Sequence, residues 1–288
     1  MATPLVSIIM NCRNCGAYLR EALDSVYKQT FKDYEIIFWD NQSTDDSGRI
    51  AQSYGKPLKY FRGEEFLPLG AARNAAIEKA SGKYIAFLDC DDIWLPQKME
   101  KQVALLESYK ALGLVYSDCY LIDSVGTTGE KTFFHHSPPF RGMVFNQLFQ
   151  SNPIALLTAV IIREALNKAG AFNQKYEIGE EYDLWLRIAQ YYPIDFIEQP
   201  LGKYRVHTQS TTSRHHLLNY KEDLQIRGYW LKKNPALEKE LGGRAKALKY
   251  WPIFLGAMGN IFRNKNFQSV QESLGLIKYM LFKDYEQD

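Results

Sequence analysis

Short apolar runs alternate with segments of helical periodicity through the first 110 residues of this chain. Strand-like runs cover residues 5–10, 34–39, 58–61 and 82–88, and helical spacing covers residues 18–27, the segment through Ile50 and Tyr54, and residues 70–80. Such alternation is typical of strand–helix–strand units, so it predicts an α/β fold with a mostly parallel central sheet flanked by helices. The loops that follow parallel strands form the ligand-binding edge of such a sheet.

The run at residues 82–88 ends in three carboxylates within four residues, Asp89, Asp91 and Asp92. Carboxylate oxygens at a strand end suit a hard divalent cation such as Mg²⁺ or Mn²⁺. Negative charges this close repel one another, and a cation or a basic partner would offset that repulsion. The segment therefore predicts a site for a metal-bound diphosphate. The alternative is an acidic cap on the next helix, which Pro96 would open.

Phosphate-binding loops are missing from the sequence. Neither the glycine-rich dinucleotide fingerprint nor the GK[ST] phosphate loop occurs. Phosphate must then be held by metal and basic side chains, which argues against a dehydrogenase or an ATPase.

Beyond residue 110 the pattern is weaker. A helix is predicted over residues 99–109, short strands with a glycine-rich turn over 113–136, a helix over 143–149, a strand over 158–162, a helix over 181–191 and a strand over 201–206. From residue 216 onward the spacing is helical. We expect one domain over residues 1–213, with halves at about 1–110 and 111–213, followed by a helical C-terminal extension over residues 214–288.

Bulk composition is that of an ordinary soluble protein, with 46% apolar and 24% charged residues. No apolar run is long enough to span a bilayer and no secretion signal is visible, so we expect a cytoplasmic protein. The segment from Arg214 onward carries an excess of Lys and Arg, which suits peripheral contact with anionic membrane at the inner face of the cell membrane. This excess is too small, and too isolated from any motif, to indicate nucleic acid.

Four cysteines, Cys12, Cys15, Cys90 and Cys119, have no spacing typical of a zinc or disulfide framework. Reduced thiols are the expected state. A redox or metal role for the pair Cys12 and Cys15 is the minor alternative, because no second pair completes a tetrahedral site.

Several segments in order resemble those of the family 2 glycosyltransferases: residues 6–10, 25–30, the polar cluster that begins at Asp40, residues 72–74, 84–96, 180–187 and 204–213. The resemblance implies a GT-A fold that transfers a sugar from a nucleotide-diphosphate donor, a UDP-sugar in preference, to an acceptor hydroxyl with inversion. It also implies a divalent metal, Mn²⁺ or Mg²⁺. A saccharide or lipid-linked saccharide of a bacterial cell-surface polysaccharide would be the acceptor.

The same resemblance assigns the donor site. Asp89-Cys90-Asp91 is similar to the family's DxD motif, in which Asp91 would reach the metal while Asp89 and Cys90 lie near the ribose or the metal. His207 resembles a histidine that contacts the diphosphate or metal, and Arg205 would share that work. The resemblance also places a further set near the nucleotide: Asn11, Asn14, Asp40, Asn41 and Arg73. Asn41 stands where the family commonly has Asp.

On the acceptor side, Glu181 occupies the place of the family's catalytic base, where Asp is more usual, and Asp183 and Glu180 are its rivals. Acids in a first helical turn also stabilise the helix dipole, which is the structural alternative. Two other functions stay open at this point. One is a non-catalytic nucleotide-sugar-binding scaffold of a polysaccharide-assembly complex, and the other, less favoured, is a nucleotidyltransferase.

Overall fold

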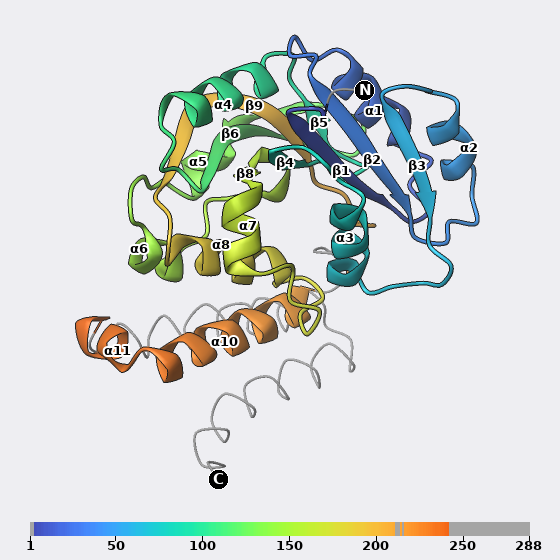
Figure 1. Cartoon of the computed structure of the whole chain (residues 1–288). Helices are drawn as coiled ribbons and strands as arrows, with labels where there is room; N and C mark the ends of the chain where they lie inside the picture. Colours follow the sequence, from blue (N-terminus) through green and yellow to red (C-terminus); the bar gives the residue numbers. More distant parts are fainter. Residues whose placement is uncertain (1–2, 211–213, 215, 242–288) are drawn as a thin grey trace, which may run out of the picture. The chain divides into compact units, whose positions relative to one another are not determined.

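The computed structural model describes residues 3–210, 214 and 216–241 (Figure 1). The chain divides into two compact units, residues 1–207 and 208–288. Of the second unit the structure describes two helices, α10 (His216–Lys233) and α11 (Pro235–Leu241). The domain boundary expected near residue 213 stays a prediction, and the extension expected over residues 242–288 lies outside the described residues.

The first unit is built on one sheet, whose first half is parallel. Strands run in the order β3 (Leu58–Arg62), β2 (Tyr34–Asp40), β1 (Val6–Cys12) and β4 (Tyr84–Phe87). Val6 lies opposite Tyr34 on one side and Tyr84 on the other, so the carboxyl ends of these strands reach the same edge. The parallel sheet expected from the sequence is confirmed here.

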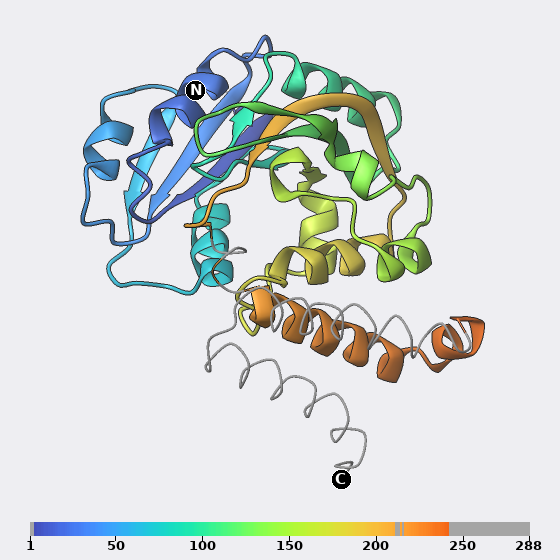
Figure 2. The same cartoon turned by 180° about the vertical axis from the view of Figure 1, so that it is seen from behind.

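Helices cover both faces of the sheet, and β1, β2 and β4 are accordingly buried along nearly their whole length and mainly apolar. Helices α1 (Leu19–Tyr27), α2 (Ser47–Gln52) and α4 (Lys98–Ser108) pack on one face, and their apolar residues join those of the strands in one core cluster. Helices α3 (Leu69–Glu78), α7 (Arg163–Ala169) and α8 (Glu180–Ala189) lie on the other face (Figures 1 and 2).

The second half of the sheet is mixed. β8 (Val160–Ile162) pairs antiparallel with β4 and with β6 (Leu114–Ile122), and β6 runs parallel to β9 (Ile194–Arg205). Two short strands, β5 (Ile93–Trp94) and β7 (Thr128–Thr132), pair antiparallel with β9 and β6. The remaining short elements are α5 (Phe133–His136), α6 (Phe145–Gln150) and the 3₁₀ turn η1 (Leu156–Thr158).

Most expected elements are present within a few residues of their predicted bounds. Helix α7 and strand β5 were not expected, and β9 begins well before the predicted strand at residues 201–206. Within the described part of the chain, no helix is long and apolar enough to cross a membrane.

A buried carboxylate fastens the amino-terminal end of the parallel sheet. Glu35 of β2 accepts hydrogen bonds from the Ser7 hydroxyl (2.6 Å), from the Ser81 backbone N–H (2.7 Å) and from Lys59 Nζ (2.6 Å). Burial by itself would raise the pKa of Glu35, but these donors lower it from 4.5 to about 2. One side chain thus joins β1, β2, β3 and the loop before β4.

We predict that Glu35→Gln destabilises the protein at pH 7 by about 1–3 kcal/mol, because charge-assisted hydrogen bonds are lost from a buried site. The folded pKa lies below the unfolded value, so the stabilisation is present above pH 4.5 and is lost as the pH falls through about 2. Urea unfolding at several pH values measures both effects. Asp46→Asn, which removes an exposed ion pair with Arg49, is the control and should change little. Equal stability of Glu35→Gln and wild type at pH 7 would contradict this role.

Candidate functional site

The carboxyl edge of the parallel strands brings together the residues that the sequence singled out. Asn11 and Cys12 end β1, opposite Trp39 and Asp40 of β2, and the turn that begins at Asp89 follows β4 directly. The β–α crossovers therefore place the polar segments that follow three neighbouring strands side by side.

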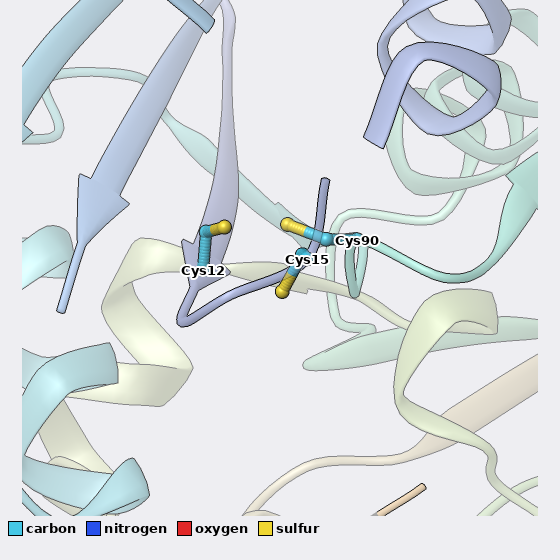
Figure 3. Close-up of side chains that lie close together, drawn as sticks. All are labelled: Cys12, Cys15 and Cys90. Carbon is cyan, nitrogen blue, oxygen red and sulfur yellow. The ribbon is translucent and has the colours of Figure 1, made fainter. Parts of the chain in front are cut away.

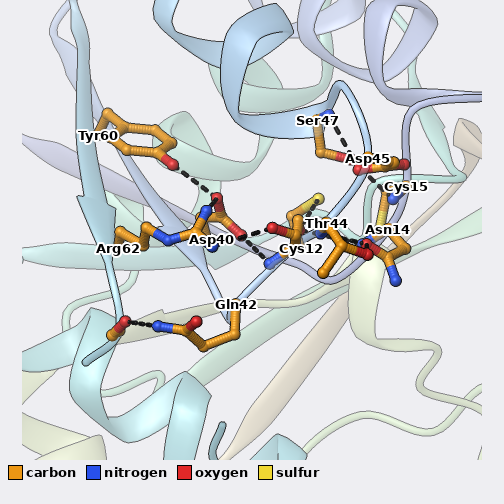
Figure 4. Close-up of polar contacts among 12 residues, drawn as sticks. Cys12, Asn14, Cys15, Asp40, Gln42, Thr44, Asp45, Ser47, Tyr60 and Arg62 are labelled. Carbon is orange, nitrogen blue, oxygen red and sulfur yellow. Dashed lines mark hydrogen bonds and ion pairs between the residues drawn. The ribbon is translucent and has the colours of Figure 1, made fainter. Parts of the chain in front are cut away.

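Asp40 is fully buried and organises the loop that follows β2 (Figure 4). Its carboxylate accepts hydrogen bonds from the Ser43 backbone N–H (2.7 Å) and the Tyr60 hydroxyl (2.6 Å), and it pairs with Arg62 at 2.9 Å. Burial alone would raise the pKa of Asp40, but the hydrogen bonds from Tyr60 and Ser43 hold it below its ordinary value. With no exposed surface, Asp40 supports the loop after β2 from beneath, and a direct nucleotide contact of Asp40 stays a prediction. Tyr60 and Arg62 were missed by sequence reasoning, because only the β2–β3 pairing brings them to Asp40.

Two asparagines fix neighbouring loops through their side-chain amides. Asn14, at φ +55°, accepts a hydrogen bond from the Thr44 backbone N–H at 2.8 Å. Asn41 donates to the Leu67 carbonyl (2.7 Å) and accepts from the Leu67 N–H (3.0 Å), so both ends of its amide hold the segment before α3. Direct reading of a base by either residue stays a prediction.

Asn11 differs from these two. Its Nδ2 is buried and has no hydrogen-bond partner within the described part of the chain. A buried donor left unpaired costs free energy, and a ligand oxygen would relieve that cost. This observation suits the nucleotide contact predicted for Asn11.

Arg73, on α3, links the carboxyl edge of the parallel strands to α8. Its buried guanidinium donates to both carboxylate oxygens of Asp89, at 3.1 and 3.3 Å, and pairs with Glu180 at the start of α8. Burial alone would lower the pKa of Arg73, but the two carboxylates raise it. The sequence placed Arg73 near the nucleotide. The structure places it between two acids that the sequence assigned to opposite sides of the site.

The three acids in the first turn of α8 have different partners. Glu180 is buried against Arg73, and Asp183 pairs with Arg187 at 2.9 Å, so both have structural partners. Glu181 has no hydrogen bond or ion pair among the residues described. Burial, followed by repulsion from Glu180, raises the pKa of Glu181 to about 8. Of the three candidates, Glu181 is the one whose carboxylate is available to take a proton.

Asp91 and His207 meet across the sheet. The Asp91 Oδ2 and His207 Nε2 atoms lie 2.9 Å apart, although the residues come from the ends of different strands. The Asp91 side chain is 31% exposed. Burial and repulsion from Asp89 raise the pKa of Asp91, which the His207 contact partly offsets. An oxygen and a nitrogen donor this close are a suitable start of a divalent-metal site.

Arg205 is buried among groups of the protein, and the diphosphate or metal contact predicted for it stays a prediction. The residue is 2% exposed, stacks on the Tyr18 ring at 4.4 Å and donates from Nε to the Asp91 carbonyl at 2.8 Å. Its own backbone N–H donates to buried Asp92 at 2.8 Å. Arg205 and Asp92 thus hold the turn that carries Asp91 against β9. The alternative of Asp92 as a helix cap is wrong, because α4 begins only at Lys98.

A group that the sequence did not assemble lies beside the same turn. The thiols of Cys12, Cys15 and Cys90 all lie within 4.8 Å of one another, and all are free (Figure 3). Hydrogen bonds from the thiols of Cys15 and Cys90 lower the pKa of Cys12. The pKa values of Cys15 and Cys90 are raised in turn, chiefly by their hydrogen bonds to Cys12. The spacing of Cys12 and Cys15 pointed to two of these three residues, and the fold adds Cys90.

Comparison with known proteins agrees with this geometry. Residues 7–170 match the glycosyl transferase family 2 profile. An uncharacterized glycosyltransferase of Methanocaldococcus jannaschii is 34% identical over 212 residues, 72% of each chain. The Escherichia coli protein WfgD, named as a UDP-Glc:α-D-GlcNAc-diphosphoundecaprenol β-1,3-glucosyltransferase, is 30% identical over 73% of this chain and 80% of its own. A longer relative in Rickettsia felis is matched over only 37% of its length.

Two solved structures share the fold. Staphylococcus aureus TarS 1–349 in complex with UDP-GlcNAc has a TM-score of 0.67 at 14% identity, covering 96% of this chain and 80% of that one. The mannosyltransferase PcManGT of Pyrobaculum calidifontis, in complex with GDP-Man and Mn²⁺, has a TM-score of 0.63 at 17% identity, covering 99% and 83%. At such identities the likeness shows the fold alone, and the expected GT-A architecture is confirmed.

We predict that Arg73→Ala destabilises the protein by about 3–5 kcal/mol, because it leaves Glu180 buried without its cation. Arg73→Lys keeps the charge but not the planar fork, so its loss should be intermediate. Thermal and urea unfolding measure both. Arg49→Ala, which removes an exposed arginine paired with Asp46, is the matched control and should cost less than about 1 kcal/mol. If Arg73→Ala is as stable as the control, the buried bridge is not a support of this fold.

Proposed function

Because the chain belongs to glycosyl transferase family 2, we propose that it moves a sugar from a UDP-sugar to an acceptor hydroxyl with inversion at the anomeric carbon. The observation that carries this proposal is Glu181, an unpaired carboxylate with a pKa of about 8 that lies beside the Arg73–Asp89 bridge. A single displacement requires a general base, close to the bound sugar donor, that takes the proton of the attacking hydroxyl. The UDP-Glc donor in the name of WfgD supports the choice of nucleotide.

Glu181 takes the proton of the acceptor hydroxyl while that oxygen attacks the anomeric carbon. The bond between the sugar and the diphosphate breaks, and its electron pair leaves with the nucleoside diphosphate. Burial and the neighbouring Glu180 give Glu181 a higher proton affinity than an ordinary glutamate. A base with such a pKa accepts a proton more readily, at the cost of being ionised only at the upper end of the physiological pH range.

Asp91 and His207 would hold a divalent cation, and Asp89 stands next to them with its carboxylate on Arg73. When bound, Mn²⁺ or Mg²⁺ neutralises charge on the departing diphosphate. The mixed oxygen and nitrogen donors favour Mn²⁺ over Mg²⁺, which prefers oxygen alone. The Mn²⁺ in the PcManGT complex is consistent with this choice.

A saccharide carried on a lipid diphosphate is the acceptor class we favour, by analogy with the acceptor in the name of WfgD. Such an acceptor lies at the membrane, so the protein would work in the cytoplasm at the inner face. The Lys and Arg excess from Arg214 onward would assist that contact with anionic lipid.

Nucleotide binding is the first test. We predict that UDP binds in the presence of Mn²⁺ and loses at least tenfold in affinity with EDTA, whereas GDP and CDP bind more weakly. Asp91→Asn should reproduce the EDTA result at full Mn²⁺, because it removes the anionic metal ligand. Calorimetric titration measures each. Asp46→Asn, an exposed acid away from this turn, is the control. UDP binding that is indifferent to both metal and Asp91 would remove the metal from the scheme.

A second prediction concerns the base. Glu181→Gln should lower kcat by about 10²–10⁴-fold while leaving UDP affinity unchanged, because the amide cannot accept the proton. In the wild type, kcat/KM should rise with pH toward a plateau above about 8, as the Glu181 carboxyl ionises. Glu164→Gln, an exposed acid in the first turn of α7, is the matched control. A Glu181→Gln variant with wild-type turnover would return the role to Glu180 or Asp183. Binding of UDP without any transfer or donor hydrolysis by the wild type would favour a scaffold.

A further inference from the structure

Three cysteines from two distant segments converge at the end of β1. Cys12 ends the strand, Cys15 lies in the loop after it, and Cys90 lies in the turn after β4. Their sulfur atoms lie within 4.8 Å of one another. Figure 3 shows the sulfurs of Cys12 and Cys90 directed toward each other, with Cys15 next to Cys90 and its sulfur directed to one side. Among the residues that the structure describes, this is the one group of at least three His, Cys, Asp or Glu side chains that meets this distance.

We propose that Cys12, Cys15 and Cys90 form a binding site for a thiophilic d¹⁰ cation, Zn²⁺ or Cu⁺. Thiolates select such soft cations over Mg²⁺ and Mn²⁺. With zinc–sulfur bonds of about 2.3 Å, the sulfurs of a three-thiolate site lie about 3.8 Å apart, so they need to approach by only about 1 Å. On coordination the thiols release their protons to solvent.

The surroundings of the three thiols suit such a site. Each sulfur now contacts a weak partner: Cys90 donates to the Asn11 carbonyl at 3.3 Å, and Cys15 donates to the Arg13 carbonyl at 3.5 Å. Cys12 lies 3.9 Å from the Ser43 hydroxyl. These sulfur contacts are weak, so coordination costs little in lost hydrogen bonds. Cys12 and Cys90 are buried while Cys15 is partly exposed, which gives a cation a path to the site.

A cation bound to the three thiols would restrain the turn at residues 89–91, which follows β4 and is called the donor turn below. Cys90 is the middle residue of Asp89-Cys90-Asp91, and Cys12 follows Asn11 at the end of β1. A cation bonded to both sulfurs would tie the donor turn to the strand and loop that face it. The donors also differ from those of Asp91 and His207, because thiolates bind Mg²⁺ and Mn²⁺ poorly, whereas a carboxylate and an imidazole accept them.

Cadmium titration of the reduced full-length chain tests the proposal without any donor or acceptor. We expect one equivalent of Cd²⁺ per chain to produce the ultraviolet thiolate-to-cadmium charge-transfer band, and a millimolar excess of Mg²⁺ to leave the band unchanged. Zn²⁺ and Cu⁺, added as competitors, should each abolish the band, and their relative effectiveness identifies the preferred cation.

Variants locate the site. Cys15→Ser removes the partly exposed thiol and should weaken Cd²⁺ binding at least tenfold, whereas Cys119→Ser, at a buried free cysteine of β6, should bind as the wild type does. Zn²⁺ should raise the Tm of the wild type and of Cys119→Ser more than that of Cys15→Ser, because the variant lacks one of the thiolate ligands and the added stability follows the affinity. The melting curves without metal show whether each variant is folded. A wild-type protein with no charge-transfer band, or a folded Cys15→Ser that binds Cd²⁺ equally well, overturns the proposal.

Discussion

A single buried guanidinium connects the two sides of this site. Arg73 reaches Asp89 after β4 and Glu180 at the start of α8, and thereby joins two segments that are far apart in the sequence. Burying a cation costs free energy unless its N–H groups donate hydrogen bonds. The planar guanidinium of an arginine can bond two carboxylates at once, which the ammonium of a lysine does less well. The relative placement of the donor turn and α8 therefore depends on this residue. Helix packing alone would leave more freedom between them.

The same bridge sets the electrostatics of Glu181. Three carboxylates, Asp89, Glu180 and Glu181, share the field of one guanidinium, and two of them have its hydrogen bonds. Burial, and then repulsion from Glu180 and Asp89, raises the pKa of the third, Glu181, to about 8, although Arg73 lowers it. The acids that satisfy Arg73 therefore add to the effect of burial on the pKa of Glu181. Asp183 pairs instead with its own arginine, Arg187, one turn along α8.

Local pattern was sufficient for the parallel half of the sheet. Strands β1, β2 and β4 are mainly apolar, a composition typical of parallel strands that are covered on both faces. Strand β5 has only two residues and exists because Ile93 and Trp94 pair with Gly202 and Lys203 far along the chain, so no local pattern could reveal it. The antiparallel pairings around β8 also depend on tertiary contacts. The resemblance to a family placed Asp91 and Glu181 at the site, but the burial of Arg205 and the contact of Tyr60 with Asp40 appear only once the chain is folded.

The tripeptide Asp89-Cys90-Asp91 shows how three consecutive side chains enter three environments. Asp89 is directed to Arg73, Cys90 to the end of β1, and Asp91 to His207 at the end of β9. Successive side chains of an extended or turning backbone diverge, so a strand that ends between two others can present a different residue to each neighbour. A carboxylate on either side of a thiol therefore does not produce one mixed ligand set. Instead, Asp89 forms an ion pair with Arg73, Cys90 faces two other thiols, and Asp91 lies beside the His207 imidazole. Because all three residues belong to the turn after β4, a change at any one of them would reach the other two.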